Sequence, residues 1–332
     1  MKVAVDAMGG DYAPESVIKG ALLALKELEN LELVLVGDEE RINSEIKSQS
    51  LFRFHEYPLS IVHAPEVIEM SDSPVEALKK KKNSSIVVMN KLLSEGKVEA
   101  VVSAGNTGAM FASSSVACGR IKGVNRPTIG TILPNKGGAC LLIDAGANID
   151  CKPEHLLQFG IIGSLFIKFF LDIPNPKVGL LNIGEESSKG IPSTVAAYAL
   201  LKASHLNFIG NVEGGDVFSG EADVVVCDGF VGNILLKFAE GIASMVKYKI
   251  EDKLKHIPGI TKMMSYFEKD FDYQQYGGVP ILGINGVSII CHGHSSPKAI
   301  KNAIGESMRL IEMNFIDKIK NAVEKFNEEN GA

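Results

Sequence analysis

The sequence predicts an α/β protein whose mostly parallel sheet is covered by helices on both faces. Short runs of valine, isoleucine and leucine recur between longer helical patterns along the 332 residues. The runs are apolar throughout rather than alternating, which is typical of parallel strands buried on both faces. Prolines that fit a first helical turn separate several of the runs. Strand and helix therefore alternate, and we expect a three-layer α/β/α arrangement.

The elements are expected in a regular order. Strands are predicted at residues 3–5, 33–36, 100–102, 139–143, 178–183, 208–209, 224–226 and 287–290. Helices are predicted to begin near Pro14, Pro74, Pro153 and Pro297. The apolar segment 156–173 contains Gln158 and Lys168, so we expect a buried helix rather than a membrane span. Right-handed crossovers would join these elements into an open Rossmann-like sheet in a single catalytic domain, residues 1–332, with ligands bound beyond the carboxyl ends of the strands.

Residues 231–271 differ from this pattern and are expected to form a helical hairpin inserted in the domain. Leu235, Phe238 and Ile242 begin an apolar stripe at helical spacing, and a second stripe runs over residues 260–271. One interpretation is that the stripes pack in a core or a subunit interface. The other is that the tip, residues 257–271, touches a membrane surface with its Met and Phe side chains.

Composition excludes several classes of protein. A hydrophobic fraction of 45% with 22% charged residues fits a folded globular chain rather than a disordered one. The net charge of −6 provides no general basic field, so no nucleic-acid partner is expected. Five scattered cysteines without a CxxC pair predict reduced thiols in a cytosolic protein. An acidic residue at position 6 argues against a signal peptide.

The chain holds 33 glycines, and many of them follow predicted strands together with Asp or Asn. Of these turns, Ser103–Ala109 is the best candidate for binding an anion, because backbone N–H groups at a helix N-terminus attract negative charge. Ser103, Asn106 and Thr107 offer side-chain donors, although a plain capped βα turn fits equally well. Lys189 follows another strand, where it is either a phosphate-binding point charge or an ordinary solvated cation.

Familiar cofactor and nucleophile motifs do not occur in the sequence. There is no GxxxxGK[ST], Gly9-Gly10 is not followed by GxGxxG spacing, and no GxSxG is present. His292-Gly293-His294 has no clear third partner, which disfavours a metal site. Nucleotide cofactors and covalent catalysis are therefore disfavoured as well. The basic runs at Lys79–Lys82 and around Lys247 are either solvated helix faces or docking surfaces for an acidic partner.

Six motifs, in order along the chain, resemble those of the bacterial phosphate acyltransferase family. They are Asp6–Asp11, Ser103–Ala109, Asp144–Asn148, Asn182–Gly190, Asp228–Asn233 and Tyr276–Gly278. The family transfers an acyl group from acyl carrier protein to inorganic phosphate, and the acyl phosphate enters phosphatidic acid and phospholipid synthesis. The resemblance implies a fold similar to isopropylmalate dehydrogenases and phosphotransacetylases, a homodimer, and no cofactor or metal. It also implies a cytoplasmic protein at the inner membrane face, linked to a membrane glycerol-3-phosphate acyltransferase.

The resemblance also assigns residues to roles. Lys189 and Asn233 match the family's catalytic lysine and asparagine. Phosphate- or substrate-binding residues are expected at Gly9, Gly10, Asp11, Ser103, Gly105, Asn106, Thr107, Gly108, Asn148, Asp228, Gly229 and His294. The implied mechanism is attack of bound phosphate on the thioester carbonyl, with His294 as a candidate proton donor to the leaving thiolate. Alternatives are a phosphotransacetylase-like enzyme using acyl-CoA, an NAD-dependent dehydrogenase on the same fold, and a non-catalytic adaptor at a lipid surface.

Overall fold

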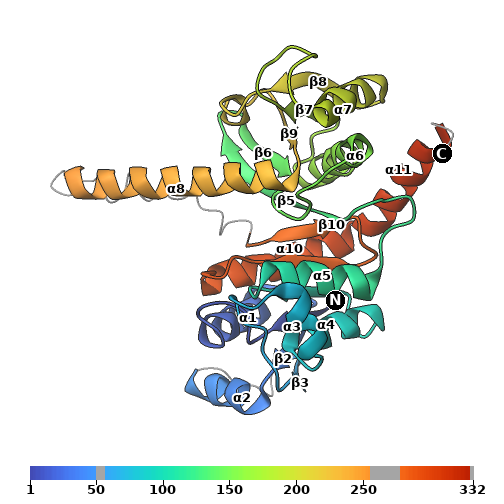
Figure 1. Ribbon diagram of the computed structural model, residues 1–332. Helices are drawn as coiled ribbons and strands as arrows, with labels where there is room; N and C mark the ends of the chain where they lie inside the picture. The colour runs from blue at the N-terminus through green and yellow to red at the C-terminus, as the bar shows by residue number, and fades with distance from the viewer. Residues whose placement is uncertain (50–56, 255–276, 330–332) are drawn as a thin grey trace. The chain divides into compact units, whose positions relative to one another are not determined.

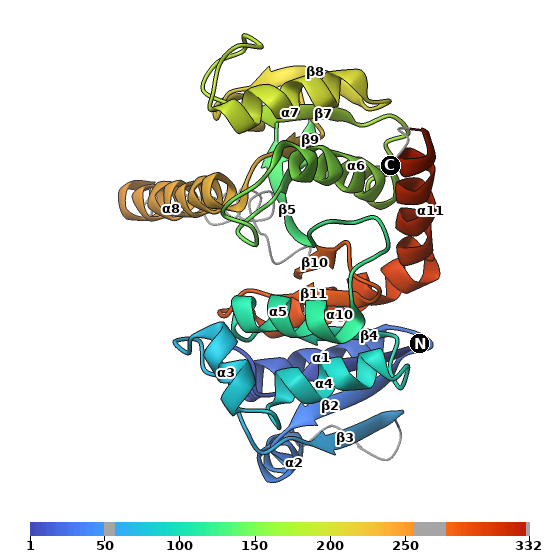
Figure 2. The same cartoon turned by 45° about the vertical axis from the view of Figure 1, so that its right-hand side comes forward.

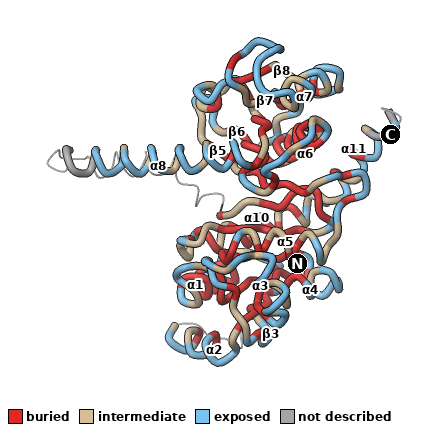
Figure 3. The backbone as a smooth tube through the Cα atoms, in the orientation of Figure 1, coloured by how far each residue is buried: buried red, intermediate tan, exposed pale blue. Residues whose placement is uncertain are grey.

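Two sheets, one in each of two units, organise the chain in the computed structural model, which describes residues 1–49, 57–254 and 277–329 (Figure 1). Unit 1 comprises Met1–Pro127 and Gln274–Ala332, and unit 2 comprises Thr128–Tyr273. Each unit has its own buried core, drawn in red in Figure 3. The expectation that residues 1–332 act as a single catalytic domain stays a prediction.

The sheet of unit 1 is parallel except at one edge. Its strands are β1 (Lys2–Asp6), β2 (Glu32–Gly37), β3 (Leu59–His63), β4 (Ala100–Ser103), β10 (Val279–Leu282) and β11 (Val287–Ile290). They lie in the order β3-β2-β1-β4-β11-β10, and β10 is antiparallel to β11. All residues of β4 and β11 are buried, which explains their continuous apolar runs. The carboxyl ends of β1, β4 and β11 therefore meet at one edge of this sheet.

Helices cover both faces of this sheet. They are α1 (Glu15–Glu27), α2 (Glu39–Ser48), α3 (Pro74–Lys80), α4 (Ser85–Ser94), α5 (Thr107–Cys118), α10 (Pro297–Glu312) and α11 (Phe315–Glu329). The pair α1 and α10 and the pair α4 and α5 both pack on β1 or its neighbours, and Figure 2 shows them as separate layers. Gly20 permits the close approach of α1 to α10, because a Cβ there would lie 2.6 Å from Ile300 Cβ.

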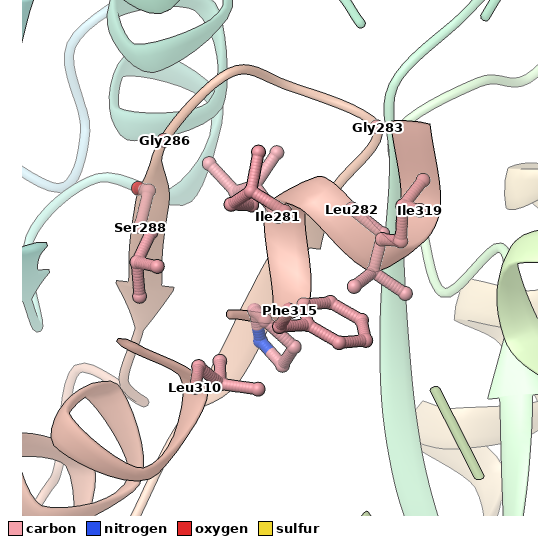
Figure 4. A pocket seen from close by; sticks show the side chains of 11 residues that line it. Ile281, Leu282, Gly283, Gly286, Ser288, Leu310, Phe315 and Ile319 are labelled. Atoms are coloured by element: carbon pink, nitrogen blue, oxygen red, sulfur yellow. The ribbon is translucent and has the colours of Figure 1, made fainter. Parts of the chain in front are cut away.

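An apolar seam completes unit 1 where α11 meets the hairpin of β10 and β11 (Figure 4). Phe315 and Ile319 of α11 are buried beside Ile281 and Leu282 of β10, and Leu310 of α10 joins them. The seam has no space for a water molecule. It is therefore a packed part of the core rather than a ligand cavity.

Unit 2 repeats the three-layer plan with fewer elements. Its strands are β5 (Thr128–Asn135), β6 (Gly138–Ile143), β7 (Lys177–Leu181), β8 (Asn207–Val212) and β9 (Val224–Val226), and its helices are α6 (Pro153–Phe170), α7 (Pro192–Ala203), the short 3₁₀ helix η2 (Asp216–Phe218) and α8 (Gly229–Leu254). The strand order is β5-β6-β9-β7-β8, with β5 antiparallel to β6 and the others parallel. Successive strand residues face opposite layers. Val224 of β9 lies against Gly163 of α6, whereas Val225 belongs to the buried cluster on which Leu235 of α8 packs.

Most of the predicted elements are confirmed. The segment predicted as a buried helix is α6, and Phe159, Phe166 and Ile167 are all at most 1% exposed. The strand predicted at 178–183 is shorter, because β7 ends at Leu181, and the Asn182 side chain then accepts the N–H of Ile183. Strands β3, β5 and β10 were not predicted from the sequence.

The first half of the predicted hairpin is the long helix α8. Residues 255–271, including the proposed membrane-contacting tip at 257–271, lie outside the described residues, as does Tyr276. Figure 3 shows α8 as largely exposed beyond its first turns. Within the described ranges one segment, Gly229–Ile250, is long and apolar enough to cross a membrane by length and composition alone.

Candidate functional site

The predicted site residues lie in the loops and first helical turns that follow the carboxyl ends of parallel strands, and each unit holds one set of them. The unit 1 cluster holds Gly9, Gly10, Asp11, Ser103, Gly105, Asn106, Thr107, Gly108 and His294, and the unit 2 cluster holds Asn148, Lys189, Asp228, Gly229 and Asn233. In open α/β sheets, ligands bind at the edge formed by the carboxyl ends of the strands, where both sets of residues lie.

A buried carboxyl group, that of Asp6 at the end of β1, organises the unit 1 cluster. Ser103 Oγ donates to Asp6 Oδ2 at 2.7 Å, and the Met8 N–H donates to Oδ1 at 3.1 Å. Burial raises the pKa of Asp6, although hydrogen bonds from Ser85 and Ser103 act in the opposite direction. A Cβ on Gly9 would lie 2.5 Å from Asp6 Oδ2, so only glycine fits there. Asp6, whose role the sequence left open, therefore anchors the turn.

Asn106 builds the turn that opens α5. Its Oδ1 accepts the N–H of Ala109 at 3.0 Å, which caps the helix. Its Nδ2 lies 3.2, 3.2 and 3.0 Å from the carbonyl oxygens of Glu69, Met70 and Asp72. Ser103 is similarly engaged, since its Oγ also accepts the Gly105 N–H at 3.0 Å. These side chains shape the turn, and their predicted role as phosphate donors stays a prediction.

The first turn of α5 leaves donors open to an anion. In the part of the chain that the structure describes, neither the hydroxyl group of the exposed Thr107 nor the N–H groups of Thr107 and Gly108 make a hydrogen bond. Gly108 packs against α3, because a Cβ there would lie 2.6 Å from Pro74 Cγ. The 12-residue helix adds its positive N-terminal dipole to these donors. The turn can therefore hold a phosphate oxygen.

His294 and Asp11 meet at the same edge of unit 1. The Asp11 N–H donates to the Gly293 carbonyl at 2.9 Å, which joins the loops after β1 and β11. His294 Nδ1 lies 2.5 Å from Asp11 Oδ2, and the Tyr12 ring centroid lies 5.7 Å from that of His294. Gly10, at φ +102°, allows the tight bend before Asp11. His294 is 62% exposed, so a substrate can reach its ring.

A second buried carboxyl group, Asp144, organises the unit 2 cluster. It follows β6 and accepts the N–H groups of Gly146, Ala147 and Asn148 at 3.0, 2.8 and 2.8 Å. The side chain of Asn148 donates to the same carboxyl group at 2.6 Å. Burial raises the pKa of Asp144, and these four hydrogen bonds act against the rise. The turn's donors are directed at Asp144, so this turn is a support rather than an anion site.

The first turn of α8 presents Asn233 above that support. The Asp228 side chain accepts the Val231 N–H at 2.9 Å, and the Gly229 N–H donates to the Asn148 carbonyl at 2.7 Å. A Cβ on Gly146 would lie 3.4 Å from Asn233 Oδ1. The Asn233 side chain is exposed and makes no hydrogen bond among the described residues. Its amide is thus available to a reacting oxygen, as the prediction requires.

Lys189 lies in the loop after β7, with its side chain 50% exposed and its Nζ 4.0 Å from Glu186 Oε1. Next to this loop, a polar cavity of about 460 Å³ is lined by the carboxylates of Glu185, Asp216 and Glu221, which outnumber its lysine, Lys177. Those carboxylates repel a phosphate ion, so we do not expect the substrate phosphate to occupy this cavity.

Thiol and metal chemistry find little support in the arrangement. All five cysteines lie in the described part of the chain and form no disulfide. Burial raises the pKa of Cys118 to about 11 and that of Cys291 to about 12, which disfavours a reactive thiolate. In the described ranges, no group of three or more His, Cys, Asp or Glu side chains is placed to hold a metal ion.

The fold and its loops define an α/β protein with glycine-rich turns at the carboxyl ends of its parallel strands. A phosphotransacetylase from Streptococcus pyogenes matches at a TM-score of 0.63 and 19% identity, covering 94% of each chain. A branched-chain phosphotransacylase from Enterococcus faecalis V583 matches at 0.59 and 17% identity, covering 94% of this chain and 99% of that one. At these identities the likeness concerns the fold alone, and it confirms the predicted fold class.

Sequence comparison gives the family. A family model described as fatty acid synthesis protein matches residues 1–318. The phosphate acyltransferase of Desulforamulus reducens is 50% identical over 330 residues, 98% of each chain, and that of Pelotomaculum thermopropionicum is 47% identical over 331 residues, 98% of this chain and 95% of that one. The chain belongs to this phosphate acyltransferase family and is an acyltransferase. The resemblance found in its six motifs is confirmed.

Proposed function

We propose that the enzyme transfers an acyl group from acyl carrier protein to inorganic phosphate, giving an acyl phosphate for phosphatidic acid and phospholipid synthesis. The observation that carries the proposal is the open first turn of α5, where the Thr107 hydroxyl and the N–H groups of Thr107 and Gly108 have no hydrogen-bond partner within the described residues. An unpaired helix N-terminus with a hydroxyl group suits a phosphate dianion.

The reaction needs no protein nucleophile. A phosphate oxygen attacks the thioester carbonyl carbon, and the new C–O bond produces a tetrahedral oxyanion. The oxyanion collapses, the C–S bond breaks, and the phosphopantetheine thiolate leaves and takes up a proton, for which His294 is the candidate donor. Phosphate is already anionic at neutral pH, so positioning and charge stabilisation matter more than a strong base.

Lys189 and Asn233 provide the charge stabilisation. The half-exposed Lys189 ammonium supplies a positive charge to the phosphate or the oxyanion. The free amide of Asn233 donates a hydrogen bond to the same developing charge. Loss of one such donor typically lowers kcat about 10² to 10³-fold.

Acyl carrier proteins are acidic, and we propose the lysines at the end of α3 as their docking surface. Lys79 and Lys82 are exposed, whereas Lys81 is held by Asp72 at 2.6 Å and by the Val67 carbonyl at 2.8 Å. Lys79→Glu with Lys82→Glu should raise KM for the carrier protein and leave KM for phosphate unchanged. An unchanged carrier KM would exclude this surface.

The exposed face of α8 supports a homodimer as a further part of the proposal. Its apolar side chains at 40–65% exposure are Phe230, Val231, Ile234, Phe238, Ile242, Met245 and Tyr248. Such a stripe calls for a partner, and a second copy of the helix provides one. We further propose that residues 257–271 contact the inner membrane face of a cytoplasmic enzyme whose product passes to a membrane glycerol-3-phosphate acyltransferase.

Hydroxylamine trapping tests the reaction. Purified enzyme, acyl carrier protein charged with a fatty acyl group, and phosphate are incubated with hydroxylamine, which converts acyl phosphate to a hydroxamate. Hydroxamate that forms only with enzyme and phosphate supports the proposal. Efficient formation from acyl-CoA and none from the charged carrier protein would favour the phosphotransacetylase-like alternative. A thermal shift on adding NAD would favour the dehydrogenase alternative.

A further inference from the structure

The loop that carries Lys189 is held by two asparagine side chains, one at the start of the loop itself and one on the neighbouring strand β8. Residues 182–190 follow β7, and within them the Lys189 N–H donates to the Glu186 carbonyl at 3.0 Å. Apart from this backbone bond, most backbone N–H and carbonyl groups of the loop have no backbone partner within the loop. Two further side chains, to which the sequence assigned no role, provide additional ties: those of Asn182 and Asn211.

Asn182 holds the end of the loop at Lys189. Its backbone N–H continues the sheet by donating to the Val212 carbonyl at 2.9 Å, so its position is fixed by β8. Its Nδ2 donates to the Lys189 carbonyl at 2.9 Å, and its Oδ1 accepts the Ile183 N–H at 2.9 Å. Gly190 bends the chain directly after Lys189 with φ +99°, and a Cβ there would lie 2.5 Å from Asn182 Oδ1.

Asn211 holds the middle of the loop from β8. It is 8% exposed, and its Nδ2 donates at 2.9 Å to the Glu186 carbonyl, which also accepts the Lys189 N–H. Its buried Oδ1 has no hydrogen-bond partner among the described residues. Burial of an unmatched acceptor is unfavourable, and an apolar residue would avoid it. The bond to Glu186 is therefore what this side chain contributes.

These ties fix the backbone at Lys189, while its long side chain stays half exposed. The nearest carboxylate, Glu186, lies 4.0 Å from Nζ in an exposed pair and constrains the ammonium group only weakly. The position of the charge therefore depends on where the loop places the lysine backbone. A misplacement of about 1 Å can lower a rate about 10²-fold.

We propose that Asn182 and Asn211 are positioning residues that hold Lys189 in register for acyl transfer. The inference rests on the proposed function, because it concerns the lysine assigned there to charge stabilisation. Asn182 acts through the Lys189 carbonyl, and Asn211 acts through the Glu186 carbonyl that accepts the Lys189 N–H.

The test uses the full-length enzyme, hydroxamate formation from the charged carrier protein, and thermal unfolding. Asn211→Leu keeps the approximate size of the side chain, removes the bond to Glu186 and also removes the unmatched acceptor. We expect a Tm within about 2 °C of the wild type or higher, with kcat lowered about tenfold or more and both KM values within about twofold. For Asn182→Ala we expect the same changes in Tm, kcat and KM. Asn207→Ala is the matched control, because Asn207 lies on the same strand and donates to the Asn175 carbonyl at 3.1 Å, away from the loop.

Double variants test whether the asparagine substitutions lower kcat by displacing Lys189. In a Lys189→Ala background, Asn211→Leu and Asn182→Ala should lower kcat no further, since the group they position is gone. The inference is overturned if both single variants match Asn207→Ala, or if their losses are the same in the Lys189→Ala background. A fully active Lys189→Ala enzyme overturns the role of the lysine and this inference together. An impaired Lys189→Ala enzyme with normal asparagine variants overturns this inference alone.

Discussion

Glu306 makes the stability of unit 1 depend on pH in a way that can be measured. It lies on α10, and its Oε1 is buried without a hydrogen-bond partner among the described residues. Burial raises the pKa of Glu306 from 4.5 to about 7, even though Arg309 lowers it. Between these two values the folded chain holds a proton that the unfolded chain has lost. Glu306 therefore favours folding below pH 4.5, and that contribution is lost as the pH rises to about 7.

The size of the effect follows from the shift. A difference of about 2.5 pKa units at about 1.4 kcal/mol each gives roughly 3.5 kcal/mol as an upper value. Glu306→Gln keeps the shape but cannot ionise. Relative to wild type, the variant should gain up to about 3 kcal/mol in free energy of unfolding between pH 5 and pH 8. Urea unfolding followed by circular dichroism at both pH values measures this gain. If the difference in free energy of unfolding between wild type and variant does not change with pH, the reasoning is refuted.

Further predictions concern the site, α8 and the thiols. Thr107→Val removes the hydroxyl at the start of α5 and should raise KM for phosphate about tenfold with little change in Tm; an unchanged KM would exclude Thr107 from phosphate binding. Phe238→Asp, on the exposed face of α8, should shift the protein from dimer to monomer in sedimentation velocity, whereas Glu240→Gln should not; a persistent dimer would contradict this interface. Iodoacetamide at neutral pH should leave Cys118 unlabelled in a peptide mass map, because the pKa of Cys118 is raised to about 11; rapid labelling of Cys118 would show otherwise.

The sequence was informative where burial dictated residue type. The runs that became β1, β4 and β11 are covered on both faces, so most of their residues are apolar. Proline at the first turn marked α3, α6 and α10 correctly. By contrast, β5 contains Gly130 and Pro134 and pairs with β6 in an antiparallel hairpin, so its pattern lacks the continuous apolar run. Strand β3 lies at the sheet edge and is only partly buried, which removes the same signal.

The loops of the candidate site could be located from the sequence. Which side chains in them support the turns, and which are free to meet a ligand, could not. Asn106 and Asn148 looked like ligand donors, yet their amides bond to the 69–72 segment and to Asp144. A single asparagine in a sequence carries no information about which groups its amide meets. Asn211 received no role from the sequence for a related reason, since it lies within a strand and reaches the Lys189 loop only through the pairing of β7 with β8.

The central claim is that phosphate itself attacks the thioester and leaves as acyl phosphate. The most direct measurement follows one reaction mixture by ³¹P NMR while the free thiol of the carrier protein is titrated. The account predicts one acyl phosphate formed for each thiol released, with both rates lowered together in Lys189→Ala. Thiol release without acyl phosphate would mean hydrolysis by water and would contradict the claim.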